Sequence, residues 1–512
     1  MPKWNGAMTQ EFKALTNNNT WILVKPPPNR KPIGCKWVLR VKYNKDGSIE
    51  RFKARLVAKG FHQQAGFDFD ETFSPVVKPI TIRVVLTIAV TRGWSIRQLD
   101  VNNAFLNGEL QEEIYMQQPP GFVSEEHPDY VCKLNKAIYG LKQAPRAWFE
   151  KLSTALISMG FHSSKADHSL FIKATTTYSI YILVYVNDIL IMASNDNVVT
   201  STISSLNATF TLKDLGQVDY FLGIQVTKTE QGLHLTQTKY LQDLLTKAKM
   251  QNVKTSNTPM NSGLKLSSYG SEPMEDVTLY RSIVGGLQYA TITSSELSYC
   301  VNKVCQFMQT PLQQHWIAVK RILLYIADTL DYGLHLQPAP DFSIEAFCDA
   351  DWAANPDDRR STTNYCIYLG GNLVAWKSQK QVTISRSSTE AEFRSLASTV
   401  SEISWIQSLL TELHIPQPSI PTVWCDNQST VLLAANPVLH ARTKHIEIDL
   451  YFVRDKVLQQ QLQVRHVPAA AQIADCLTKP VSSSKFPDLR SKLNVVSQHT
   501  LSLKGAVKGS DS

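Results

Sequence analysis

The spacing of apolar residues changes along the chain between the 3.6-residue period of a helix and the two-residue period of a strand. Helices are predicted over residues 81–92, 146–159 and 239–250. Strands are predicted over residues 37–58, 95–99, 178–186 and 189–193. The first strand stretch is basic and contains an Asp-Gly turn signal within Asn44 to Gly47, which predicts an exposed β-hairpin.

Polar residues stand where predicted strands end. Asp100 follows the strand 95–99 directly. Asn187 and Asp188 alone separate two β-rich runs, which is typical of a hairpin with polar residues at its tip. We therefore expect carboxylate chemistry at this tip.

The 512 residues are several times the ~150 residues of a typical domain, so several packed units are expected. A polar stretch at 256–276 leads into a helical middle at 280–331, which shows no obvious chemical group. From Phe342 to about Pro480, strands and helices alternate, which indicates a separate α/β domain.

The composition is that of an ordinary globular protein, with 43% apolar and 19% charged residues, which excludes wholesale disorder. The eight cysteines form no CxxC pair, which argues against a structural zinc site and favours a reduced, intracellular chain. No signal peptide opens the sequence. The longest apolar stretch, 180–193, is too short to span a bilayer, so we expect no membrane association.

The formal net charge of +8 is a weak indication of a polyanionic partner. The positive surplus is concentrated between Lys36 and Lys59, where eight Lys and Arg face only Asp46 and Glu50. A solvated strand edge protected by lysines is the alternative reading of this segment.

Five motifs follow one another in the first half of the chain: RFKARLVAKGF (51–61), ETFSPVVKP (71–79), QLDVNNAFLNG (98–108), YGLKQAPRAW (139–148) and DLGQVDYFLGI (214–224). They resemble the copia-type retrotransposon reverse transcriptases, in the family's order. With motifs of the last domain, the resemblance extends from Trp4 to Pro480, and an ordered set is far more specific than one pattern.

The resemblance implies an α+β multidomain fold. A right-hand polymerase with fingers, palm and thumb is followed by a helical connection and an α/β ribonuclease H-like domain. The expected segments are an N-terminal lead (1–16), the reverse transcriptase (17–255), the connection (256–341), the ribonuclease H-like domain (342–481) and a loose polar tail (482–512).

Joining a nucleotide to a primer is a phosphoryl transfer assisted by two Mg²⁺ ions about 4 Å apart, which require anionic oxygen ligands. The resemblance implies Asp100, Asn187 and Asp188 as the catalytic set, with Asp100 and Asp188 as metal ligands. The family's tyrosine, any residue, aspartate, aspartate pattern ends here in Asn187 and Asp188. An amide brings no negative charge, so we expect severely reduced polymerisation.

The resemblance also implies residues that contact the incoming nucleotide. Lys53 and Arg55 match the residues that grip the triphosphate, and Gln143 matches a segment beneath the nucleotide. Phe105 matches the aromatic residue that excludes a 2′-hydroxyl, which implies deoxynucleotide selectivity, although a core phenylalanine is the competing interpretation.

A primer-gripping turn is implied at Phe221, Leu222 and Gly223. An ordinary β-turn explains the same residues equally well.

Four acids of the last domain resemble the ribonuclease H acids: Asp349, Glu390, Asp426 and Asp475, within CDADWA, SSTEAEF, CDNQST and QIADCLTKP. All four are expected to be catalytic and to bind metal. Glu390 also fits a capping box with Ser387, and Asp426 also fits a helix cap.

Three further polar residues of this domain are left without a catalytic assignment. Asp351 is not assigned to the metal, and the motif around His445 and Glu447 leaves their role open.

The implied substrates are an RNA template, a DNA primer, an RNA/DNA hybrid and deoxynucleoside triphosphates, with two Mg²⁺ ions per active site that Mn²⁺ can replace. Binding of the hybrid is expected to weaken steeply with salt. A cytoplasmic particle and the nucleus are both compatible locations. The sequence indicates neither the host, the primer nor the oligomeric state.

A non-catalytic reading competes with this one. In this interpretation the chain is a decayed or repurposed element protein that binds nucleic acid. Asn187 favours it. The start at Met1 directly before the polymerase motifs favours it too, since capsid, protease and integrase segments are then not expected. An active ribonuclease H beside an inactive polymerase is the intermediate possibility.

Overall fold

The computed structural model describes residues 2–28, 30–43, 46, 48–251, 253–436 and 444–501. In the predicted hairpin turn, Asn44, Lys45 and Gly47 lie outside the described residues. The chain forms two compact units, which we call the first unit (Met1–Lys78 with Ser95–Gln217) and the second unit (Pro79–Trp94 with Val218–Ser512).

The described residues of the first unit form three sheets, with strand orders β1-β6-β5, β2-β3 and β11-β4-β10-β9-β8-β7. Its helices are α1 (Pro2–Asn17), α3 (Ala144–Ser158) and α4 (Asp196–Thr209). Its strands are β1 (Trp21–Val24), β2 (Cys35–Tyr43), β3 (Ile49–Ala58), β4 (Ser95–Val101), β5 (Glu109–Met116), β6 (Val131–Lys136), β7 (His162–Ser163), β8 (Leu170–Ala174), β9 (Ser179–Tyr185), β10 (Asp188–Ala193) and β11 (Leu212–Gln217).

The six-stranded sheet carries the main core of the first unit. Trp148, Leu152 and Leu156, which lie on one face of α3, are fully buried together with apolar residues of β4, β9 and β10. The sequence predictions of this helix and of the hairpin β9–β10 are confirmed. The β2–β3 hairpin predicted from the basic stretch is confirmed as well.

Two five-stranded sheets lie in the described part of the second unit, with strand orders β12-β13-β14-β15-β21 and β18-β17-β16-β19-β20. Its helices are α2 (Pro79–Thr91), α5 (Thr238–Lys247), α6 (Val277–Ala290), α7 (Ser298–Cys305), α8 (Gln313–Asp328), α9 (Ser388–Glu412), α10 (Gln428–Ala435), α11 (Glu447–Leu458), α12 (Asp475–Thr478) and α13 (Phe486–Lys492). Its strands are β12 (Tyr220–Phe221), β13 (Ile224–Thr229), β14 (Gly232–Thr236), β15 (Tyr332–Leu336), β16 (Ile344–Asp351), β17 (Thr362–Leu369), β18 (Asn372–Lys380), β19 (Thr422–Cys425), β20 (Gln463–His466) and β21 (Val495–Ser497).

The predicted α+β class and its α/β last domain are confirmed. β16, β17 and β18 are antiparallel neighbours, whereas β19 runs parallel to β16 and β20 runs parallel to β19. The long helix α9 packs against β16 and β17. This strand order agrees with the ribonuclease H-like sheet that the resemblance implies, and its parallel strands bring their carboxyl ends to one edge.

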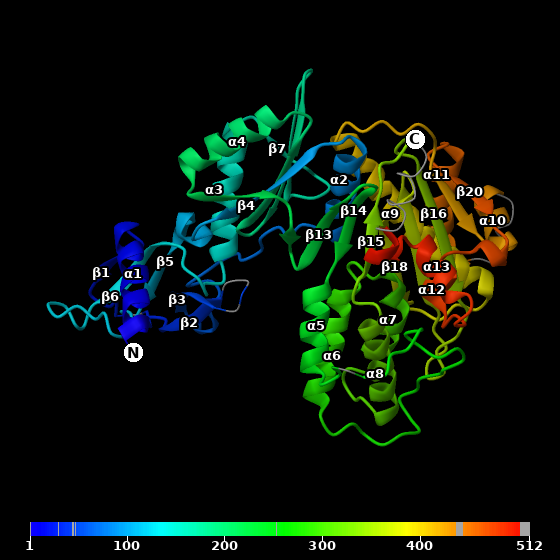
Figure 1. Cartoon of the computed structure of the whole chain (residues 1–512), viewed down its shortest axis with the longest axis horizontal. Helices are drawn as coiled ribbons and strands as arrows, with labels where there is room; N and C mark the ends of the chain where they lie inside the picture. Colours follow the sequence, from blue (N-terminus) through cyan, green and yellow to red (C-terminus); the bar gives the residue numbers. More distant parts are fainter. Residues whose placement is uncertain are drawn as a thin grey trace. The chain divides into compact units, whose positions relative to one another are not determined.

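The helical middle is confirmed as α6, α7 and α8, which Figure 1 shows grouped with α5 beside β13, β14 and β15. The sheet next to these helices combines strands from three predicted segments: β12–β14 from the polymerase segment, β15 from the connection and β21 from the tail. Backbone pairing therefore joins segments that the sequence pattern separates, and the second unit crosses the predicted boundaries at 255, 341 and 481.

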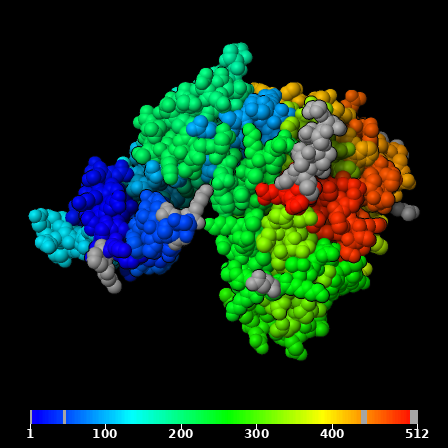
Figure 2. Space-filling model, in the orientation of Figure 1, coloured from blue at the N-terminus to red at the C-terminus, as the bar shows by residue number. Residues whose placement is uncertain are grey.

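The tail predicted to be loose from residue 482 is partly ordered. Residues 486–492 form α13, and β21 pairs with β15. Leu493 and Val495 are fully buried, and the ring of Phe486 packs edge-on against Tyr325. Figure 2 shows this C-terminal segment, in red, set into the surface of the second unit.

Helix α2 belongs to the second unit, where its buried residue Arg83 contacts β18. The Nε of Arg83 donates to the backbone carbonyl of Val374 at 2.7 Å, and its guanidinium lies 3.8 Å from the ring centroid of Trp376. Burial lowers the pKa of Arg83 to about 9. The stacking and the hydrogen bond offset part of the cost of burying this charge.

The implied primer-gripping turn lies in the second unit, between β12 and β13. Leu222 and Gly223 both have positive φ, at 50° and 71°, as a two-residue hairpin turn of type I′ requires. Tyr289 donates its hydroxyl to the Leu222 carbonyl, and a Cβ at Gly223 would lie 2.6 Å from that hydroxyl oxygen. The backbone of Phe221, Leu222 and Gly223 therefore has the geometry of an ordinary β-turn. A contact with a primer stays a prediction.

Replacing Gly223 by Ala is expected to destabilise the second unit by about 1 to 3 kcal/mol, because the added methyl group displaces Tyr289 from the turn. The matched control is Gly263→Ala, which has a similar φ of 81° and open space around the Cβ. Thermal melting of both variants measures the difference. Equal melting temperatures would contradict the role given to the Tyr289 contact.

Candidate active sites

The first candidate site is the tip of the β9–β10 hairpin beside β4. The strand register places Asp188 directly opposite Asp100. Val186, in the turn, has a φ of 53°, which is uncommon for a β-branched residue. The indole Nε1 of Trp148 donates to the Val186 carbonyl at 2.6 Å and holds the turn in this conformation.

Asn187 is tied to Asp100 by its side chain. Its amide Nδ2 donates to Oδ1 of Asp100 at 2.6 Å, and its backbone carbonyl accepts from the Val101 N–H at 2.9 Å. The amide therefore occupies one oxygen of the Asp100 carboxylate. Burial, followed by the neighbouring Asp100 charge, raises the pKa of Asp188 to about 6.

The residues at this tip fit a divalent cation only in part. Asp100 and Asp188 offer two hard, anionic groups on adjacent strands, as Mg²⁺ prefers. The third position presents an amide hydrogen to Asp100 where a carboxylate would present another oxygen. The tip thus combines the geometry of a metal site with a reduced negative charge.

An aromatic group connects two of the predicted nucleotide-binding residues. The guanidinium of Arg55 lies 4.1 Å from the ring centroid of Tyr139, and the rings of Tyr139 and Phe105 are 4.8 Å apart. The Asp100 charge is among the influences that raise the pKa of Tyr139, after burial. Tyr139 was not assigned from the sequence, although it begins the YGLKQAPRAW motif.

The structure places the remaining two nucleotide-binding candidates differently. Lys53 is half-buried on β3, and its pKa is lowered by burial and by the positive charge of Arg55. Gln143 is only 2% exposed; its amide donates to the Asp68 carbonyl at 2.8 Å and accepts from Gln63 at 3.0 Å. Gln143 therefore fastens the start of α3 to the 63–68 loop.

The second candidate site lies at the carboxyl ends of β16 and β19. These parallel strands pair Cys348 with Cys425, so the residues that follow, Asp349 and Asp426, emerge side by side. Asp349 is 6% exposed, and the hydroxyl of Thr478 donates to its Oδ2 at 2.6 Å. The sheet topology brings together acids that are 77 positions apart (349 to 426) in the sequence.

The glutamate of this centre is Glu392, and not Glu390 as expected from the sequence. The Glu392 carboxylate lies near Asp349 and Asp426, and one of its oxygens is within 4.8 Å of an Asp426 oxygen. One turn further along α9, the hydroxyl of Ser395 donates to the Asp349 backbone carbonyl at 2.9 Å. This contact fixes the rotation of the helix so that the face carrying Glu392 meets the aspartates.

Glu390 has a structural role at the start of α9. Its carboxylate accepts from the Arg386 backbone N–H at 2.9 Å and from Arg394 at 3.0 Å, and its own N–H donates to the N-cap Ser387. These bonds resemble the capping box that competed with the catalytic assignment. They occupy both oxygens of Glu390.

Asp475 enters the second site from α12, which also supplies Thr478. Lys479 lies 2.7 Å from Asp475 and balances part of its charge. The segment is held to β16 by Gln472, whose amide donates to the Cys348 carbonyl at 2.9 Å. Neither Thr478 nor Gln472 was assigned from the sequence, because uncharged residues inside a motif give no signal of their own.

The protein surroundings of the second site disfavour the ionised form of two of its carboxylates. Burial and the neighbouring Asp475 and Asp426 raise the pKa of Asp349 to about 7, against the opposing Thr478 hydrogen bond. Burial and the Asp349 charge raise the pKa of Glu392 to about 11. A cluster whose members hold protons so strongly fits a divalent cation, which would favour the ionised carboxylates.

Three other polar residues near this site have contacts of their own. Asp351 accepts from the Thr362 backbone N–H, which agrees with leaving it out of the metal set. The His445 backbone carbonyl accepts from Arg394 at 3.2 Å, while its side chain is exposed, as is that of Glu447. These contacts give neither His445 nor Glu447 a chemical role.

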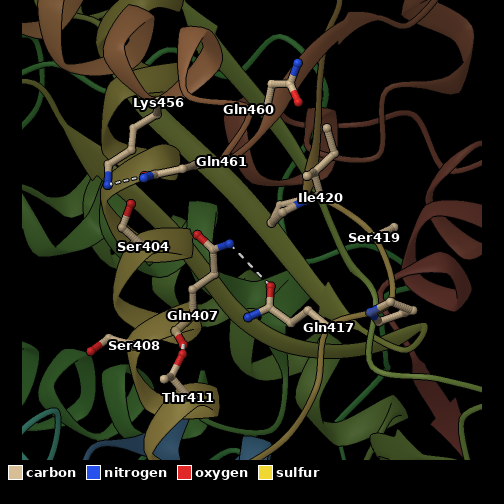
Figure 3. A pocket seen from close by; sticks show the side chains of 12 residues that line it. Ser404, Gln407, Ser408, Thr411, Gln417, Ser419, Ile420, Lys456, Gln460 and Gln461 are labelled. Carbon is tan, nitrogen blue, oxygen red and sulfur yellow. Dashed lines mark hydrogen bonds between the residues drawn. The ribbon is translucent and has the colours of Figure 1, made fainter.

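A separate concavity of about 620 Å³ lies in the second unit between α9, the 417–421 loop and α11. Figure 3 shows its polar lining, with Gln407 bonded to Gln417 and Lys456 bonded to Gln461. None of its lining residues is an Asp, Glu, His or Cys. This concavity therefore resembles an ordinary polar protein surface. The two acid clusters remain the candidate active sites.

A sequence model described as reverse transcriptase (RNA-dependent DNA polymerase) matches residues 18–262. The retrovirus-related Pol polyprotein from transposon RE1 of Arabidopsis thaliana is 49% identical over 494 residues, covering 96% of this chain and 34% of the relative. A putative transposon Ty5-1 protein of Saccharomyces cerevisiae is 35% identical over 308 residues, covering 60% of this chain and all of the relative. The chain spans about a third of the length of the Arabidopsis relative.

Among solved structures, a foamy viral protease-reverse transcriptase in complex with double-stranded DNA matches with a TM-score of 0.48 and 12% identity. The match covers 90% of this chain and 69% of the viral chain. In the described part of the chain, no helix combines the length and apolar character that a membrane crossing requires.

Proposed function

Because the chain belongs to the copia-type retrotransposon Pol polyproteins, we propose that its two acid sites are a ribonuclease H centre and an impaired RNA-directed DNA polymerase centre. The observation that carries the proposal is the convergence of Asp349, Glu392, Asp426 and Asp475 on one end of a ribonuclease H-like sheet. The complete acid set supports cleavage of the RNA strand of an RNA/DNA hybrid.

In the nuclease centre, the four carboxylates would hold two Mg²⁺ ions, which Mn²⁺ can replace. When bound, the ions supply an activated water and neutralise charge on the phosphate that is cleaved. The protein residues position this chemistry. Thr478 orients the Asp349 carboxylate through its 2.6 Å hydrogen bond, and Lys479 beside Asp475 offers a positive charge near the phosphate backbone.

In the polymerase centre, Asp100 and Asp188 would hold Mg²⁺ at the hairpin tip. Lys53 and Arg55 would contact the triphosphate of a deoxynucleotide, and Phe105, packed on Tyr139, would limit the space at its sugar. Gln143 would act through the 63–68 loop, since its side chain is buried. The template is RNA, and the DNA primer is expected to contact the turn at Phe221, Leu222 and Gly223.

The polymerase centre is proposed to be weak because of Asn187. Its amide removes one negative charge and holds Asp100 Oδ1 in a hydrogen bond, which must break before that oxygen binds a cation. Both effects lower metal affinity, and neither changes the hairpin that carries Asp188.

A non-catalytic nucleic-acid-binding protein is the second candidate function, and Asn187 is the observation that favours it. The two candidates differ at the nuclease centre, since a protein without catalytic function has no need of the paired Asp349 and Asp426 positions. Loss of both activities in a folded protein would support this second candidate.

The test is cleavage of an RNA/DNA hybrid labelled on its RNA strand by the purified chain in Mg²⁺. We expect RNA fragments that disappear on chelation of Mg²⁺, and binding of the hybrid that weakens steeply with added salt. An intact RNA strand in the presence of a folded, hybrid-binding protein would contradict the proposal.

A further inference from the structure

A sulfur atom lies inside the nuclease centre. The Sγ of Cys425, a carboxylate oxygen of Glu392 and one of Asp426 all lie within 4.8 Å of one another. Among the described residues, these three side chains are the group of His, Cys, Asp or Glu that lies close enough together to hold one metal ion. Mg²⁺ takes oxygen ligands, so the thiol has no part in the proposed cleavage.

Glu392 brings to this group a buried carboxylate oxygen that has no hydrogen-bond partner. The residue is 6% exposed, and its Oε2 has no hydrogen-bond partner among the described residues. A buried polar atom without a partner is costly, which is an independent sign that a ligand belongs there. Asp426 is only partly buried and leaves a path from solvent.

The thiol of Cys425 is held loosely. Its Sγ donates weakly to the Asn427 carbonyl at 3.9 Å and is hydrogen-bonded to the thiol of Cys348 on the neighbouring strand. A weak hydrogen bond costs little to replace by a metal–sulfur bond.

We propose that Glu392, Cys425 and Asp426 form a binding site for a thiophilic divalent ion, Zn²⁺ or Cd²⁺, whose occupation blocks Mg²⁺-dependent cleavage. Binding forms a metal–sulfur bond as the S–H bond breaks and its proton passes to water, with no change of oxidation state. Thiolate ligands select such ions over Mg²⁺. The blocking effect rests on the proposed nuclease function, because the ion takes two of its four carboxylates.

The direct test is titration of the full, metal-free chain with Cd²⁺, followed by the ultraviolet charge-transfer absorption of the cadmium–thiolate bond. We expect a saturable absorption band that Cys425→Ser loses. The matched control is Cys366→Ser, which changes an equally buried cysteine of β17, in the same sheet, and is expected to keep the band. Thermal melting of each variant checks that it is folded.

Glu392→Gln provides a second variant that keeps every thiol. Removing one ligand is expected to weaken Cd²⁺ binding by roughly tenfold or more. A band that is unchanged in Cys425→Ser, or a Cd²⁺ affinity that is unchanged in Glu392→Gln, would overturn the proposed site.

Hybrid cleavage in Mg²⁺ separates this proposal from the nuclease function. We expect Cd²⁺ and Zn²⁺ to inhibit the chain as written, and Cys425→Ser to require at least about tenfold more of either ion, relative to its own uninhibited rate. Equal inhibition of both proteins would refute the blocking role while the nuclease function stands. The expected absorption changes without cleavage in any sample would support the metal site and refute the nuclease function.

Discussion

Asn187→Asp is expected to raise the rate of DNA primer extension on an RNA template by more than about 100-fold in Mg²⁺. Loss of an outer-shell partner alone typically changes metal affinity or activity by about 10 to 100-fold, and a carboxylate that contacts the ion should matter more. The change puts a carboxylate in place of the amide that donates to Asp100 Oδ1. The hairpin tip then has a third anionic group beside Asp100 and Asp188. The hairpin keeps its Trp148 and Val101 hydrogen bonds, since both involve backbone atoms of the turn.

Two controls separate charge from hydrogen bonding. Asn187→Ala frees Asp100 but adds no charge, so it should recover far less activity than Asn187→Asp. Asp100→Asn in the Asn187→Asp background removes a proposed metal ligand and should abolish the gain. Equal extension by the chain as written and by Asn187→Asp would contradict the account of this site.

Glu392→Gln is expected to reduce Mg²⁺-dependent cleavage of the hybrid by more than about 100-fold, because the change removes a proposed metal-binding carboxylate. Glu390→Gln is the matched control, two positions away on the same helix. It should cause a far smaller loss of cleavage and a lower melting temperature, since Glu390 bonds Arg386 and Arg394. Rates measured at saturating hybrid compare the two variants directly.

The opposite pattern would restore the assignment made from the sequence motif. If Glu390→Gln lost cleavage while Glu392→Gln retained it, the acid cluster seen here would not be the catalytic arrangement. Equal losses in both variants, with both proteins folded, would also contradict the structural role given to Glu390.

The placement of Asp100 and Asp188 could be predicted from sequence because both depend on strand periodicity. Local alternation predicts a strand up to residue 99, which in the structure continues to Val101, and a hairpin tip at 187–188. Antiparallel pairing then sets Asp100 and Asp188 opposite each other. The hydrogen bond from Asn187 to Asp100 could not be predicted, because it depends on the rotation of two side chains.

The choice between Glu390 and Glu392 could not be made from local pattern. Both residues stand in the first turns of α9, and a capping motif accounts for Glu390 equally well. The deciding contact, from Ser395 to the Asp349 backbone, joins positions 46 apart. The buried face of the helix offered a signal, since Glu392 is in phase with Ser395 and Thr399, which are fully buried.

The two compact units also depend on contacts that no local pattern reveals. Helix α2 was predicted correctly as a helix, yet its Arg83 bonds Val374, 291 positions away. The strand at Val495 pairs with Leu334 on β15, which follows the helical middle. Residues 482–512 are polar overall, so the sequence pattern gave no sign that buried Leu493 and Val495 hold this segment against the second unit.

The most direct test of the central claim is one reaction in which a labelled DNA primer on a labelled RNA template is incubated with the purified chain, Mg²⁺ and deoxynucleoside triphosphates. The account predicts that the RNA strand of the hybrid is cut while the primer is barely extended, and that Asn187→Asp extends the primer without a change in RNA cleavage. An intact RNA strand, or primer extension by the chain as written at the rate of Asn187→Asp, would contradict it.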